Sequence, residues 1–447
     1  MTDQQNHQVF QDKLHHLVAD SPMSTLQLIV ILMCFVLNMI DGMDILVVSF
    51  TATKLEAEWN LSKSELGLVF SAGLIGMMIG CLFMAPLADK IGRTSMLLIS
   101  TTGVAISMLT TVIINDYALM LFLRLITGMG IGCLLPTMAA VATEFANEKS
   151  RNFSVAFFQA GWPIGAIITG LFVSWAVPIY GWRIAYLTAG IITAAMIPLI
   201  MLFMPESLEF LGKRQPKNAL RRINKLLKSM GHAPVNTLPK KPVPIEKKAT
   251  VLKLLDGKLK RPTILLWIGV FFSFMTLYTL ISWIPNIATT SGMPFDLATY
   301  AGTALNVGAF AGTLVIGWLS AWIGLNRLLF IYMLSASAFM VIYANFSLSY
   351  PILFALILLI GFSVQGGMTG FYPTAARVYP HHIRASGIGW AMGIGRTGAI
   401  AGPALFGIIF DNGVSIQTLF IIFSVPLILS GAAAYFIPLR NLKQETN

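Results

Sequence analysis

Residues 26–50 of the chain, LQLIVILMCFVLNMIDGMDILVVSF, form a continuous apolar run with only two charged residues, Asp41 and Asp44. A helix needs about 20 apolar residues to cross a bilayer, so this run is long enough to span one. A carboxylate inside such a segment costs about 2.5–3.5 kcal/mol on insertion scales, so both should face water or protein instead of lipid. Their i, i+3 spacing places them on one face of the helix. We interpret the pair as a proton- or cation-handling site on a transport path; the alternative is a loop at the helix end that dips into the headgroups.

The composition extends this interpretation to the whole chain. Of the 447 residues, 56% are hydrophobic and 11% are charged, a balance that excludes a soluble globular domain. We predict an all-α membrane protein with twelve transmembrane helices in two pseudo-symmetric six-helix halves. The predicted spans are 26–50, 64–87, 94–114, 117–142, 153–177, 183–204, 262–288, 297–320, 327–347, 351–376, 387–410 and 416–438. The predicted parts are an N-terminal tail (1–25), a first half (26–204), a central loop (205–261), a second half (262–438) and a C-terminal tail (439–447).

The distribution of Lys and Arg predicts the orientation. The central loop holds 15 of the chain's 30 basic residues, whereas only Lys54, Lys63 and Arg183 fall in loops on the opposite side. By the positive-inside rule, the central loop and both termini are cytoplasmic, as in a multi-pass protein of the cytoplasmic (inner) membrane. The net charge of +11 is therefore explained by membrane topology and not by a nucleic-acid partner. Three cysteines within apolar spans are interpreted as packing residues, and no cluster has metal-ligand spacing.

An internal repeat supports the two halves. Residues 85–94 read APLADKIGRT and residues 317–327 read GWLSAWIGLNR, so that Gly92 and Gly324 occupy the same place between the second and third helices of their halves. Glycine there allows a tight turn between two close helices. We interpret Asp89, Gly92 and Arg93 as a cytoplasmic gating loop, with a purely topogenic loop as the alternative.

Further charges bracket cytoplasmic turns at matching points of the two halves. These are Glu144 with Arg151 and Arg377 with Arg384. They are candidate gating charges, although topology alone also explains them.

The first loop resembles the loop signature of the major facilitator superfamily, with Ala85 at its leading glycine and Thr94 at its last basic position. Residues 124–132, RLITGMGIG, are similar to that superfamily's fourth-helix motif. Pro205-Glu206-Ser207 is similar to its sugar- and acid-porter motif after the sixth helix. The resemblance covers residues 20–440.

Within that superfamily, Asp41-Gly42-Met43-Asp44 is similar to the first-helix motif of the aromatic acid:proton symporter family. Residues 379–403 resemble that family's run from helix 10 into helix 11, and residues 278–285 fit its helix 7. The resemblance implies uptake of aromatic carboxylates, such as benzoate, hydroxybenzoate, protocatechuate or vanillate, with protons and by alternating access. The proton is then the coupling ion, there is no other cofactor, the partners are the substrate and the lipid bilayer, and a monomer suffices. No enzymatic activity is expected.

Two arginines lie within predicted spans and need carboxylate partners, since a guanidinium does not lose its proton. Arg124 is predicted to pair with Asp41 or Asp44, so that protonation breaks the pair; a static buried ion pair is the alternative. Arg396, in a glycine-rich stretch of helix 11, is the candidate clamp for the substrate carboxylate, with interhelical bonding as the alternative.

Other polar and aromatic residues in spans complete the predicted substrate site, and each is equally suited to interhelical packing. They are Gln159, Asn306, Gln365, Tyr278 and Trp283.

Three other functions stay open. One is proton-driven export of drugs or metabolites, although Gly161-Trp162-Pro163 matches only a fragment of the antiporter motif. Another is transport of a non-aromatic carboxylate such as muconate, and the third is a sensor or scaffold that does not transport.

Overall fold

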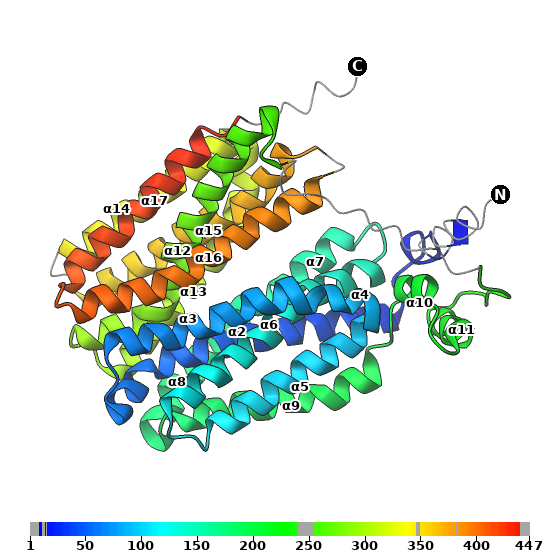
Figure 1. Cartoon of the computed structure of the whole chain (residues 1–447), viewed down its shortest axis with the longest axis horizontal. Coiled ribbons are helices and arrows are strands. Elements are labelled where there is room, and N and C mark those ends of the chain that lie inside the picture. Colours follow the sequence, from blue (N-terminus) through cyan, green and yellow to red (C-terminus); the bar gives the residue numbers. More distant parts are fainter. Residues whose placement is uncertain are drawn as a thin grey trace. The chain divides into compact units, whose positions relative to one another are not determined.

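The regular elements of the chain are all helices in the part that the structure, a computed structural model, describes (Figure 1). That part comprises residues 9–10, 14, 16–239, 254–345, 349–380 and 383–438. Within it, 12 helices are long and apolar enough to cross a membrane. The predicted fold class, an all-α membrane protein with twelve spans, is confirmed.

The first six spans are formed by α2 (Thr25–Trp59), the segment from α3 (Lys63–Ile79) to α4 (Ala88–Ile91), α5 (Arg93–Thr111), α6 (Tyr117–Phe145), α7 (Arg151–Gln159) with α8 (Gly161–Tyr180), and α9 (Arg183–Phe203). The last six are α12 (Lys260–Thr290), α13 (Phe295–Ile323), α14 (Leu325–Asn345), α15 (Tyr350–Val378), α16 (Arg384–Asp411) and α17 (Ile416–Tyr435). Two short helices, α10 (Leu208–Arg214) and α11 (Ala219–Ser229), lie in the central loop.

Some helix ends predicted from the sequence are wrong. The first helix was expected to end at residue 50, but α2 continues to Trp59 and includes Lys54, Glu56 and Glu58. Hydropathy marks the part of a helix that crosses lipid, whereas the hydrogen-bonded helix can continue into water with a charged surface. The predicted fifth helix is divided into α7 and α8 at Ala160. Pro163 explains this break, because it has no N–H to donate to the carbonyl of Gln159.

The chain forms two compact units. Unit 1 comprises Met1–Asp44, Ile75–Gly165 and Tyr186–Lys247; unit 2 comprises Ile45–Leu74, Ala166–Ala185 and Lys248–Asn447. Unit 2 therefore contains the last six spans together with the C-terminal parts of α2 and α8 and the N-terminal parts of α3 and α9. The halves 26–204 and 262–438 stay a prediction from the repeat. The predicted tail 439–447 and residues 240–253 of the central loop lie outside the described residues, as does most of residues 1–15.

The central-loop helix α11 packs on protein. Its apolar stripe, Ile223, Leu226 and Leu227, is buried in the hydrophobic core of unit 1 with residues of α2, α6 and α10. Its basic residues Arg221 and Lys225 are exposed. This amphipathic helix thus covers the surface of unit 1.

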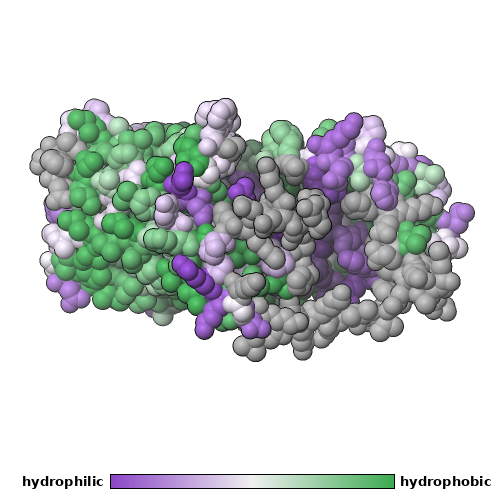
Figure 2. Space-filling view, turned by 90° about the horizontal axis from the view of Figure 1, so that it is seen from above, coloured by the Kyte–Doolittle hydropathy of each residue, from purple (hydrophilic) through white to green (hydrophobic). Residues whose placement is uncertain are grey.

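The surface of the spans is apolar. Large hydrophobic side chains such as Ile113, Leu202 and Trp322 are 75–78% exposed. Figure 2 shows broad hydrophobic areas on the visible face, with hydrophilic patches between them. Such exposure is what lipid-facing helices require.

Candidate functional site

Asp41 and Asp44 of α2 are buried in unit 1, each with 2% of its surface exposed. Both carboxylate oxygens of Asp44 lack a hydrogen-bond partner within the described residues. The positive charge of Arg124 and the negative charge of Asp41 both act on Asp44. Because an ionised carboxylate without hydrogen bonds is costly to bury, Asp44 is suited to take up and release a proton.

Arg124 of α6 is also buried in unit 1, with 3% exposed. Its guanidinium lies over the ring of Tyr186, 5.0 Å from the centroid, and its Nη2 donates to the sulfur of Met108 at 3.3 Å. Its Nε has no hydrogen-bond partner in the described part of the chain. The predicted ion pair of Arg124 with Asp41 or Asp44 stays a prediction, but the structure places the arginine and Asp44 within electrostatic reach of each other.

The two aspartates lie where α2 and α8 approach closely. A Cβ added to Gly42 would lie 2.2 Å from the carbonyl oxygen of Trp162, so only glycine fits between Asp41 and Asp44 at this distance. The glycine of the motif therefore fixes the position of both carboxylates relative to α8.

Sequence reasoning missed Asn38, which lies one turn before Asp41. Its Nδ2 donates to the carbonyl of Phe158 at 2.9 Å and to that of Gln159 at 3.2 Å. Asn38 thus satisfies carbonyls at the break between α7 and α8. A buried amide within an otherwise apolar run was the signal that could have found it. The predicted site residue Gln159 contributes its backbone here, and its side chain is exposed.

Arg396 and Tyr278 are brought together in unit 2. Nη1 of Arg396 donates to the hydroxyl of Tyr278 at 3.3 Å, and the guanidinium lies 6.0 Å from the centroid of the phenol ring. The ring of Phe274 stacks on Tyr278 at 5.9 Å. A guanidinium beside stacked aromatic rings can bind a carboxylate and the ring attached to it.

The other predicted substrate residues of unit 2 have packing contacts. Trp283 is fully buried, donates from Nε1 to the carbonyl of Pro403 at 3.1 Å and packs edge-on against Phe70. Asn306 donates to the carbonyl of Gly302 in its own helix at 2.9 Å. Gln365 of α15 is half-buried. Their substrate roles stay predictions.

The predicted gating loop forms a connected ion-pair network in unit 1. Arg93 pairs with Asp89, and it donates from Nη2 at 2.9 Å and from Nε at 3.1 Å to Oε1 of Glu144. Glu144, near the end of α6, thus forms an ion pair with Arg93 of α5. Arg151 forms an ion pair with Glu148 at 2.8 Å. This network ties the loop between the second and third spans to the end of α6.

Arg377 and Arg384, the charges at the matching turn of the second half, have other surroundings. Arg377 is exposed near the end of α15. Arg384 donates from Nε to the carbonyl of Tyr379 at 3.4 Å. Their gating role stays a prediction.

Glu206 was quoted as part of a motif but had no predicted role. Its Oε1 accepts the backbone N–H of Arg93 at 2.8 Å, so it caps the start of α5 although it follows the sixth span, 113 positions further along the chain. Burial raises the pKa of Glu206, although the N–H groups of Ser207, Arg93 and Thr94 oppose the shift. The carboxylate joins the central loop to the gating loop.

We expect Gly92→Ala to be more damaging than Gly324→Ala. Both glycines have a positive φ, +111° and +84°, so alanine costs about 1–3 kcal/mol of backbone strain at either one. Only at Gly92 would the new Cβ also lie 2.2 Å from Oε2 of Glu206, whereas it would meet nothing within 4 Å at Gly324. Thermal unfolding of the two variants in the same detergent measures the difference. Equal losses in Tm would contradict the role of Gly92 in the network.

Comparison with known proteins identifies the family. Two overlapping stretches, residues 32–368 and 266–447, match the family model of the Major Facilitator Superfamily. The chain is 31% identical over 438 residues to the 4-hydroxybenzoate transporter PcaK of Acinetobacter baylyi, covering 96% of this chain and 94% of that protein. It is 27% identical over 417 residues to the gallate transporter of Pseudomonas putida, covering 93% of each.

The fold also matches solved structures. The inward-open xylose transporter XylE from E. coli superposes with a TM-score of 0.72 at 18% identity, covering 92% of this chain and 97% of that one. The matches span nearly the whole length of both relatives and of this structure. The chain is therefore a transporter and not an enzyme, and it belongs to the aromatic acid transporter family of the major facilitator superfamily.

Proposed function

We propose that this protein carries small aromatic carboxylates into the cell together with protons, by alternating access. The observation that carries the proposal is the similarity to the 4-hydroxybenzoate transporter over 96% of the chain. The similarity to the gallate transporter supports the same class of substrate, a ring with a carboxylate.

Arg396 and Tyr278 form the proposed substrate site. A carboxylate accepts two parallel hydrogen bonds from a guanidinium, which fixes its plane as well as its position. The contact between Arg396 and the Tyr278 hydroxyl holds the guanidinium beside an aromatic surface, where a benzoate ring stacks favourably.

Asp41, Asp44 and Arg124 form the proposed proton site. A proton from outside neutralises Asp44 or Asp41 and removes its attraction to Arg124, which changes the preferred packing of α2 and α6. The loaded carrier opens inward and releases both substrate and proton. Both termini and the central loop lie in the cytoplasm, the protein resides in the cytoplasmic membrane, and a monomer carries out the cycle.

Uptake into proteoliposomes tests the proposal. Labelled 4-hydroxybenzoate, protocatechuate, vanillate and benzoate are offered with an imposed inward proton gradient, and a protonophore and protein-free liposomes serve as controls. We expect that the protonophore abolishes uptake and that only some of the ring acids inhibit it by competition. Intact protein that takes up none of the four acids would overturn the substrate class, and muconate uptake and dye efflux would then be measured.

A further inference from the structure

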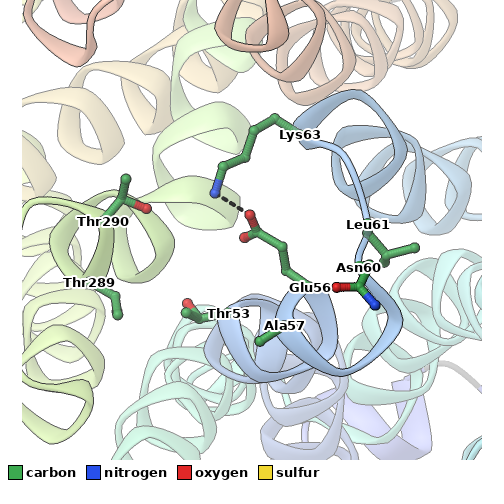
Figure 3. Close-up of a pocket in the computed structure, with 8 residues that line it drawn as sticks. All are labelled: Thr53, Glu56, Ala57, Asn60, Leu61, Lys63, Thr289 and Thr290. Carbon is green, nitrogen blue, oxygen red and sulfur yellow. Dashed lines mark ion pairs between the residues drawn. The ribbon is translucent and has the colours of Figure 1, made fainter.

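A closed polar network, of which Figure 3 draws the pair of Lys63 and Glu56, lies at the turn between the first two spans, within unit 2. Nζ of Lys63 lies 2.5 Å from Oε1 of Glu56 and donates to Oδ1 of Asn286 at 3.2 Å. Nδ2 of Asn286 donates in turn to Oε2 of Glu56 at 2.7 Å. Three side chains from α2, α3 and α12 thus satisfy one another in a ring.

A fourth residue ties the same turn to α16. The carboxylate of Asp411, the last residue of α16, accepts the backbone N–H of Lys63 at 2.8 Å and that of Ser64 at 2.9 Å. These are the first two residues of α3, so Asp411 caps that helix from 348 positions away in the sequence. A carboxylate at a helix N-terminus satisfies free N–H groups and the helix dipole together.

The network has a defined side of the membrane. Lys63 falls on the side opposite the basic central loop, which is the outer side in the predicted topology. A pocket of about 450 Å³ lies beside the ion pair, and Thr53, Asn60, Thr289 and Thr290 line it together with Glu56 and Lys63 (Figure 3). The side chains of Lys63 and Glu56 are only 18% and 20% exposed, so water screens their attraction less than it screens a surface pair.

We propose that Glu56, Lys63, Asn286 and Asp411 form the outer gate of this carrier. The inference rests on the proposed transport function and assigns residues to one of its steps. For the outer side to open, the turn at Lys63 must leave α12 and α16, and every bond of the network that crosses to those helices must break. The network therefore sets the balance between the outer-closed and outer-open states.

Lys63→Gln removes the ammonium but keeps a side chain of similar length. Loss of a half-buried ion pair is expected to raise the outer-open population roughly 3- to 10-fold, which corresponds to about 0.7–1.4 kcal/mol. Spin labels at Ala57→Cys in α2 and at Ser291→Cys directly after α12, in a chain without Cys34, Cys81 and Cys133, report the separation of these two helix ends by double electron–electron resonance. We expect a longer-distance population to grow in the variant.

Transport provides an independent readout. Since apparent affinity from outside scales with the fraction of competent carrier, Lys63→Gln is expected to lower the external concentration that half-saturates uptake, by the same 3- to 10-fold. Damaged folding would lower the amount of active carrier without this change in affinity. The exchanged pair Glu56→Lys with Lys63→Glu is expected to restore most of the closed population, because Asn286 can rotate its amide to exchange donor and acceptor.

Glu58→Gln is the matched control. Glu58 makes an ion pair of 2.6 Å with Arg183 and accepts from Nε1 of Trp182 at 2.7 Å, also near the outer end of α2, but these contacts join only the first six spans. The distance distribution and the half-saturating concentration of Glu58→Gln should match those of the parent chain. Unchanged distances in Lys63→Gln, or equal changes in Glu58→Gln, would overturn the gate. The distance measurement requires no transported substrate, so failure of the proposed function would appear separately, as absent uptake with the distance shift intact.

Discussion

Asp44→Asn is expected to abolish accumulation of an aromatic acid driven by a proton gradient. Both carboxylate oxygens of Asp44 are buried without a hydrogen-bond partner among the described residues, and the charge of Arg124 acts on this group. Asparagine has the same shape but binds no proton, so the two charge states that drive the cycle are replaced by one neutral state. Uptake should fall to the level of protein-free vesicles.

A substrate-exchange assay distinguishes loss of proton coupling from loss of folding in Asp44→Asn. Exchange of labelled for unlabelled substrate across the membrane requires no net proton movement, so Asp44→Asn should retain it while losing accumulation. Asp116→Asn is the control, because Asp116 caps α6 by accepting the N–H of Leu119 at 2.7 Å, and asparagine caps equally well. Full accumulation by Asp44→Asn would show that this residue is not the proton carrier.

Arg396→Lys is expected to weaken binding of the aromatic acid about 10- to 100-fold, the equivalent of about 1.5–3 kcal/mol for a hydrogen bond to a charged group. Lysine keeps the positive charge but loses the planar fork that binds both carboxylate oxygens. It also loses the position that the Tyr278 hydroxyl gives to the guanidinium. Calorimetry on the purified protein measures the affinity directly.

A second arginine of the same unit provides the comparison. Arg327 of α14 is exposed and has no predicted role, so Arg327→Lys should leave the affinity unchanged. An unaltered affinity in Arg396→Lys would show that Arg396 bonds only to other helices, which is the alternative for this residue.

The sequence by itself determined the helical fold. Continuous apolar runs of about 20 residues mark membrane spans because lipid offers the backbone no hydrogen bonds, and this constraint acts on each segment locally. The paired glycines at 92 and 324 were predicted from the repeat, and both have the positive φ that a tight turn needs. Asp89 and Arg93, one helical turn apart, were predicted as parts of one gating loop, and the structure joins them in an ion pair. Arg396 and Tyr278, in different helices, were both predicted as substrate residues, and the structure places them in contact.

The tertiary structure alone decided which distant groups meet. Glu144 pairs with Arg93 and not with Arg151, Glu206 caps α5 from 113 positions away, and Asp411 caps α3. Asn38 bonds two carbonyls at the end of α7, one of which, that of Gln159, lost its helical donor to Pro163. Hydrophobicity and helix periodicity are properties of neighbouring residues, whereas these contacts depend on how helices rotate and slide against one another, which packing between whole helices determines.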